Sequence, residues 1–192
     1  MTLSFNGAAT VAAAPTDVWN ELIDWTGQER WIPLTTMRLI SEHAEGLGAR
    51  IRAQHGLPIG KRRLGISDEL LITGWEPPYE LEVTHLGPWF TGEGVFTIEG
   101  RGRRTWLSVR ERIKLPGGKP IESAVLAVRP VLQRQLAGSL KRFARVVADK
   151  VPEPTELADP ARRYLARHTK AAAFVDEAKK RARRQQRRVA RF

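Results

Sequence analysis

Apolar and polar residues alternate along most of the first 115 residues, which is the period-two pattern of half-buried β-strands. A first strand is expected between Leu3 and Val11. Six more are expected where alternating runs end near glycine or proline, over residues 36–43, 49–55, 66–75, 79–86, 92–99 and 104–115. The stretch GLPIGKRRLG, residues 56–65, is rich in glycine and basic residues and is predicted to form a loop.

Two stretches follow the helical period instead. In PTDVWNELIDWT, Val18, Leu22 and Trp25 fall at i, i+4 and i+7 on one face, which predicts a helix after the first strand. A longer helix is predicted over residues 123–151, where apolar residues recur every three or four positions. Pro130 interrupts this pattern, so the helix either kinks or begins there. The order is therefore strand, one or two short helices, six strands and a long helix, which is an α+β arrangement.

Six segments in this order carry a family resemblance. The most distinctive is WEPPYEL, from Trp75 to Leu81. The full set consists of VAAAPTDVWNELIDW at 11–25, WIPLT at 31–35, GLGARIRA at 46–53, ITGWEPPYELEV at 72–83, GEGVFTIE at 92–99 and AVRPVLQRQLAGSLKRFARVV at 127–147. Over residues 1–151 the chain resembles the START-like (SRPBCC) superfamily, in the branch of polyketide cyclase/dehydrase and lipid-transport-like proteins.

This resemblance implies a helix-grip fold, also called START-like or Bet v 1-like. In such a fold a curved, seven-stranded antiparallel sheet wraps around the long C-terminal helix and leaves a cavity for an apolar ligand between them. Ligand pockets are mostly apolar and carry a few polar groups. The fold hosts carriers, cyclases and receptors alike, so the resemblance does not decide between binding and catalysis.

Strand alternation predicts which side chains point into that cavity. Ile51 and Ala53 form an apolar face that we take as the inner one, and His55 shares it. The same alternation turns His85 and Glu111 inward. A histidine beside a carboxylate can transfer protons during an aldol-type cyclisation and dehydration. The residues predicted to contact the ligand are Trp31, Ile51, Ala53, His55, Val83, His85, Trp89, Phe96, Val109, Glu111, Leu132 and Leu136.

A second interpretation makes the polar residues structural. A slip of one residue in the register would turn Glu111 to solvent beside Arg110 and Arg112. Both histidines stand close to a glycine, where a strand can end. Trp31 and Trp89 are open to the same two interpretations, as amphipathic rings at the cavity mouth or as packing residues of the core and rim.

Composition excludes several classes of site. The chain has no cysteine, which excludes disulfides, zinc ribbons, iron–sulfur clusters and cysteine nucleophiles. It has no dinucleotide fingerprint, Walker loop or serine nucleophile elbow, and its histidines lack a third ligand at zinc-site spacing. We therefore expect no metal and no cofactor. The N-terminus lacks a signal-like apolar run and no stretch suits a membrane span, so a cytoplasmic location is expected.

Charge divides the chain in two. Residues 1–150 carry a net charge of +4, whereas residues 151–192 carry +7 in under a quarter of the length. We expect a ligand-binding domain over 1–151 and a basic, helical or partly disordered extension over 152–192. Lys179–Phe192 contains eight basic residues and no acidic one. Such a segment suits the phosphates of nucleic acid or an anionic lipid surface, and a solvated tail is the alternative.

The sequence leaves three functions open. The leading one is the binding of a small hydrophobic molecule, a lipid or polyketide-like compound, in the predicted cavity. The second is a cyclase or dehydratase on the same scaffold, which needs a buried acid–base pair. The third is an interaction protein that contacts nucleic acid or an anionic membrane through its basic tail. No pattern in the sequence indicates the oligomeric state.

Overall fold

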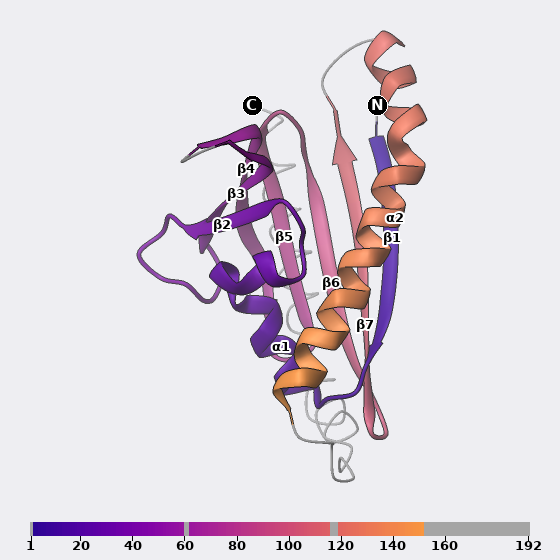
Figure 1. Cartoon of the computed structure of the whole chain (residues 1–192). Helices are drawn as coiled ribbons and strands as arrows, with labels where there is room; N and C mark the ends of the chain where they lie inside the picture. The colour runs from indigo at the N-terminus through magenta and orange to yellow at the C-terminus, as the bar shows by residue number, and fades with distance from the viewer. Residues whose placement is uncertain (1, 60–61, 116–118, 152–192) are drawn as a thin grey trace, which may run out of the picture. The chain divides into compact units, whose positions relative to one another are not determined.

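A computed structural model describes residues 2–59, 62–115 and 119–151. Seven antiparallel strands form one sheet in the order β1-β7-β6-β5-β4-β3-β2 (Figure 1). The predicted extension over 152–192 lies outside the described residues. The strands are β1 (Thr2–Val11), β2 (Thr35–Leu39), β3 (Arg50–Ile59), β4 (Arg62–Glu76), β5 (Glu80–Pro88), β6 (Thr91–Arg101) and β7 (Arg104–Lys114).

Three helices accompany the sheet in the described residues: α1 (Pro15–Ile23), the short 3-10 helix η1 (Trp25–Arg30) and α2 (Lys119–Lys150). Pro15 begins α1, where its missing N–H is not needed, and the side chain of Asp17 accepts a hydrogen bond from the backbone N–H of Ala14. The long helix α2 continues through Pro130. Among the described residues, no helix combines the length and apolarity that a membrane crossing requires.

The long helix packs closely on the first strand at a glycine. Figure 1 shows α2 running alongside β1 and β7. A Cβ atom at Gly7 of β1 would lie 2.6 Å from Cδ1 of Leu140 and 3.3 Å from Cγ of Leu136. Only a glycine leaves these leucines in place, so a residue of β1 sets how near α2 can come to the sheet.

The two halves of α2 differ in burial. Leu140, Phe143 and Val147, in the C-terminal half, are almost completely buried in the main core. The N-terminal half keeps large aliphatic side chains exposed, namely Leu126, Val128, Val131 and Leu132. The sheet therefore holds α2 mainly by its C-terminal half, and the apolar residues of the other half stay accessible.

The predicted loop over residues 56–65 is wrong for 56–59 and 62–65, and residues 60 and 61 lie outside the described residues. Here β3 and β4 continue as paired strands, with Gly56 opposite Gly65 and Leu57 opposite Leu64. A Cβ atom at Gly65 would lie 1.8 Å from the carbonyl oxygen of His55, so the two backbones approach more closely than side chains allow. Glycine, usually a sign of a loop, here permits close strand approach.

Candidate functional site

A hydrogen-bonded aspartate–histidine pair lies on the inner face of the sheet. Nδ1 of His85, on β5, donates to Oδ2 of Asp68, on β4, over 2.5 Å. Their side chains are 12 % and 1 % exposed, so water screens the pair little. The register of β4 against β5 shifts between Asp68 and Leu70, and such an irregularity re-aims a side chain. An ionised carboxylate only accepts hydrogen bonds, so with Asp68 ionised the proton between the two residues lies on Nδ1 of His85.

A glycine on β6 lies beside both His85 and Glu111. Gly94 pairs with Glu111 of β7 on one side and with Val83 of β5 on the other. A Cβ atom at Gly94 would lie 2.9 Å from Cγ2 of Val83, 3.7 Å from Cγ of Glu111 and 3.9 Å from Nε2 of His85. The side chain of Glu111 and Nε2 of His85 therefore both lie against the inner side of Gly94.

The environment of Glu111 favours its protonated form. Burial raises the pKa of this carboxyl above its usual value of 4.5 and is the largest influence on it. The neighbouring His85 lowers the pKa of Glu111, and the negative charge of Asp68 raises it. Glu111 thus keeps its proton to a higher pH than an exposed glutamate does, which suits a proton donor.

His55, on β3, lies near these residues as well. We call Asp68, His85, Glu111 and His55 the polar cluster. Its Nδ1 lies 2.8 Å from Oγ1 of Thr35, on the neighbouring strand β2. Burial lowers the pKa of His55 below its usual value of 6.5, while Asp68 raises it and His85 lowers it. The ring is therefore neutral near pH 7. Three polar residues were predicted to point inward, and the structure places all of them near Asp68: His55, His85 and Glu111. Asp68 itself was not among the predicted site residues.

Asp68 nevertheless had a signal in the sequence. On β4, Asp68 lies two residues before Leu70 and four before Ile72, and both of these are buried. Because every second side chain of a strand points to the same face, alternation places Asp68 on the inner face. Its partner His85 comes from the next strand, seventeen residues further on. No local spacing motif links the two residues, and only the pairing of β4 with β5 brings them together.

Three buried polar atoms within the described ranges have no hydrogen-bond partner: Oδ1 of Asp68, Nε2 of His85 and Nε1 of Trp31. Buried polar atoms in folded proteins are nearly always paired, because an unpaired one costs about 1–3 kcal/mol. Two of the three belong to the aspartate–histidine pair. In the same ranges, no three His, Asp or Glu side chains form a group suited to a metal ion.

The apolar residues predicted to contact a ligand separate into three groups. Ile51, Ala53, Val83 and Val109 are buried in the core, and Phe96 and Leu136 pack against it with partial exposure. Trp89 and Leu132 are exposed. Trp31, which could also have been a residue of the cavity mouth, lies in the core, where its ring meets the edge of Phe143 at a centroid distance of 5.0 Å.

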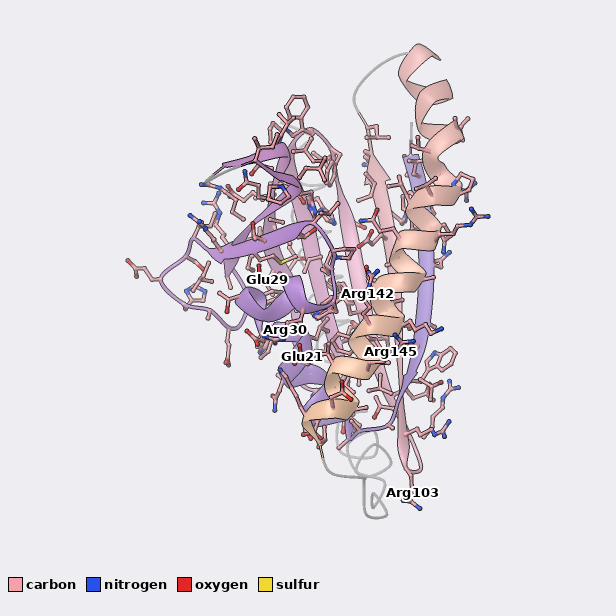
Figure 2. The ribbon with its side chains drawn as sticks, in the orientation of Figure 1. Glu21, Glu29, Arg30, Arg103, Arg142 and Arg145 are labelled. Carbon is pink, nitrogen blue, oxygen red and sulfur yellow. The ribbon has the colours of Figure 1, made fainter. Side chains whose placement is uncertain are left out.

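A surface pocket of about 200 Å³ lies away from this cluster, between α1 and the C-terminal end of α2. Its walls include Glu21, a buried carboxylate paired with Arg30 of η1 and with Lys150 of α2. Figure 2 shows Glu21 and Arg30 beside each other, on the side that faces Arg142 and Arg145 of α2. The ion pairs satisfy Glu21 and join three helices, which is a structural role.

Solved structures of similar fold exist. A conserved protein from Geobacillus kaustophilus has 20% identity and a TM-score of 0.61, with 77% of this chain and 96% of that chain covered. The Zhui aromatase/cyclase from Streptomyces sp. R1128 has 16% identity and a TM-score of 0.61, over 79% and 97% of the two chains. Ara h 8.0201 has 14% identity and a TM-score of 0.58, over 78% and 99%. No family model and no curated protein sequence matches the chain. The sheet order, the position of α2 and these similarities confirm the predicted architecture: the chain has the helix-grip fold.

Proposed function

We propose that the domain binds a small, mostly apolar molecule whose polar end meets Asp68 and His85. The observation that supports this most directly is the pair of unpartnered buried atoms, Oδ1 of Asp68 and Nε2 of His85. A hydroxyl of the bound molecule can donate to Oδ1, and a second polar group can pair with Nε2. Ligand sites typically combine apolar walls with a few polar groups of this kind.

The walls proposed for this site are apolar. Ile51 and Ala53 of β3, Val83 of β5 and Val109 of β7 are buried on the face that carries the polar cluster. The exposed aliphatic residues in the N-terminal half of α2, Leu132 among them, add apolar surface that a ligand can cover. The same fold in an aromatase/cyclase and in Ara h 8.0201 supports a binding scaffold here. Lipids and polyketide-like compounds are the proposed ligand classes.

Ala53→Trp is expected to lower the occupancy of this site about tenfold or more. Ala53 is buried and pairs with Asp68 on one side and with Met37 on the other, so an indole there fills space beside the polar cluster. Native mass spectrometry of protein purified from its source organism detects the bound molecule. Titration with the dye anilinonaphthalene sulfonate measures apolar binding by the recombinant protein.

Gln54→Trp is the matched control, because Gln54 follows Ala53 on β3 and is exposed. The same indole then points away from the proposed site, and occupancy should equal that of the wild type. Circular dichroism establishes that both variants are folded. Unchanged occupancy in a folded Ala53→Trp variant contradicts the proposed site, as does a wild type that neither carries a molecule nor binds the dye.

The aspartate–histidine pair also favours a second candidate, a cyclase or dehydratase. Asp68 holds the proton on Nδ1 of His85, so Nε2 can remove a proton from a carbon next to a carbonyl group. The resulting enolate attacks a second carbonyl and forms a carbon–carbon bond, and the oxygen of that carbonyl takes the proton of Glu111. The new hydroxyl then leaves together with a second proton from the carbon next to the carbonyl group. Both are released as one molecule of water, which completes the condensation.

Turnover by such an enzyme should fall as the pH rises through the raised pKa of Glu111, because the ionised carboxyl has no proton to donate. A synthetic linear β-polyketone serves as substrate, and mass spectrometry follows the loss of water. Glu111→Gln is expected to slow turnover about 10²–10⁴-fold. Glu93→Gln changes an exposed glutamate of β6 and should leave turnover unchanged. Equal product formation by Glu111→Gln and wild type excludes this mechanism.

A further inference from the structure

The hairpin of β3 and β4 extends beyond the rest of the sheet. Strand β2 pairs with β3 only as far as His55, and β5 pairs with β4 only from Asp68 onward. Residues 57–59 and 62–64 therefore have their sheet partners only in each other among the described strands. We call these two segments the free ribbon. Both edges of this ribbon lack a neighbouring strand among the described residues, and its large aliphatic side chains are exposed.

One face of the free ribbon is aliphatic. Leu57 pairs with Leu64, and directly opposed residues of an antiparallel pair share a face, as do residues two apart on one strand. Leu57, Ile59, Leu64 and Ile66 therefore point to the same side, and they are 59%, 58%, 69% and 39% exposed. A single exposed leucine is ordinary, but a contiguous aliphatic face on a protruding hairpin marks an interaction surface.

The neighbouring hairpin adds an exposed tryptophan next to this ribbon. Trp89 lies between β5 and β6, directly after Pro88, which pairs with Asp68 at the base of the ribbon. Trp89 and the nearby Leu86 are both exposed. A tryptophan ring combines an apolar body with a polar N–H and is enriched where hydrocarbon meets water.

The charge of the free ribbon distinguishes among possible occupants. Its described strands contain Arg62 and Arg63 and no acidic residue. A second copy of the chain on this face would bring like charges together. An anionic lipid surface suits both the charge and the aliphatic face of the ribbon. Its headgroups attract the arginines, and its acyl chains accept the aliphatic side chains.

We propose that the free ribbon and Trp89 dock the protein on an anionic lipid bilayer. The aliphatic face is continuous with the inner face of the sheet, because Ile66 pairs with His55 of the polar cluster. Docking would therefore place one end of the inner face against the membrane. The proposal does not depend on the identity, or the existence, of a ligand in the domain.

The test is co-sedimentation of the full chain with phosphatidylcholine vesicles that contain or lack phosphatidylserine. The wild type is expected to bind only the vesicles with phosphatidylserine. Arg62→Ser/Arg63→Ser should weaken the partition coefficient about 25-fold, at about fivefold for each charge near an anionic surface. Leu64→Ser should weaken it about tenfold through lost apolar burial.

Two matched controls lie away from the ribbon. Leu47→Ser changes a leucine that is 65% exposed in the connection between β2 and β3. Arg103→Ser/Arg104→Ser removes two exposed consecutive arginines, one in the turn between β6 and β7 and one at the start of β7. Arg103 lies at the far end of the sheet from the ribbon in Figure 2. Both controls should partition like the wild type. Unchanged thermal unfolding establishes that each variant is folded.

Three results would overturn the proposal. The ribbon variants could bind vesicles as well as the wild type, which is expected if the basic segment Lys179–Phe192 alone holds the membrane. The wild type could stay in the supernatant with both kinds of vesicle. Light scattering could instead detect a dimer that Leu64→Ser abolishes, without vesicle binding, which would assign the ribbon to a second copy of the chain. A loss of dye binding by Ala53→Trp, with vesicle binding intact, separates the two proposals.

Discussion

Replacing Phe143 by alanine is expected to lower the free energy of unfolding by about 3–5 kcal/mol. Phe143 is fully buried on α2 and meets Trp31 edge to face, with an angle of 84° between the rings. Alanine leaves a cavity where α2 contacts the segment after η1. It also removes an aromatic pair that contributes about 0.5–1.5 kcal/mol beyond simple burial. Urea denaturation followed by tryptophan fluorescence measures the loss.

Leu126→Ala is the control for this experiment. Leu126 lies on the same helix but is exposed, so its truncation should change the free energy of unfolding by less than about 0.5 kcal/mol. The difference between the two variants tests whether the C-terminal half of α2 carries the stability. Similar losses in both variants would contradict the arrangement in which the sheet holds α2 by that half.

Asp68→Ala is expected to lower the free energy of unfolding by about 3–5 kcal/mol, because it removes one partner of a buried, hydrogen-bonded pair. His85 then has neither of its ring nitrogens paired, since Nε2 already has no partner in the described residues. A double-mutant cycle with His85→Ala isolates the interaction. The double variant should be more stable than the sum of the two single losses predicts.

Glu69→Ala provides the matched carboxylate control. Glu69 is the next residue of β4, but it is partly exposed and pairs with the exposed Arg50 and Arg52. Such surface pairs contribute only about 0–1 kcal/mol. Equal destabilisation by Asp68→Ala and Glu69→Ala, or a cycle without coupling, would contradict the prediction. In either case the pair of Asp68 with His85 would contribute no more to the free energy of unfolding than a surface ion pair.

The conservative variant Asp68→Asn separates the structural role of Asp68 from its proposed role in binding. An asparagine oxygen can still accept a hydrogen bond from Nδ1 of His85, so Asp68→Asn should unfold less readily than Asp68→Ala. It removes the negative charge beside the proposed ligand. Reduced occupancy in a stable Asp68→Asn variant would therefore assign the carboxylate to the ligand.

Much of the fold could be predicted because it depends on local periodicity. Alternation over two residues marked all seven strands, and the three-to-four spacing of apolar residues marked α1 and α2. These patterns record which side of each element faces the core. For the same reason His55, His85 and Glu111 could be placed on the inner face. The paired strands around Gly56 and Gly65 were missed, because close backbone approach and loop formation use the same residue type.

The sequence by itself determined the order of the elements and the fold class, and it predicted an inward direction for three polar side chains while leaving a one-residue register slip open. Only the tertiary structure decided that Asp68 meets His85, that Gly94 lies beside both His85 and Glu111, and that residues 57–59 and 62–64 pair beyond the ends of β2 and β5. The physical reason is that side-chain direction follows from a strand's own period. Contacts between strands depend on register, bulges and the length over which each pair of strands overlaps, and these arise only when the whole sheet assembles.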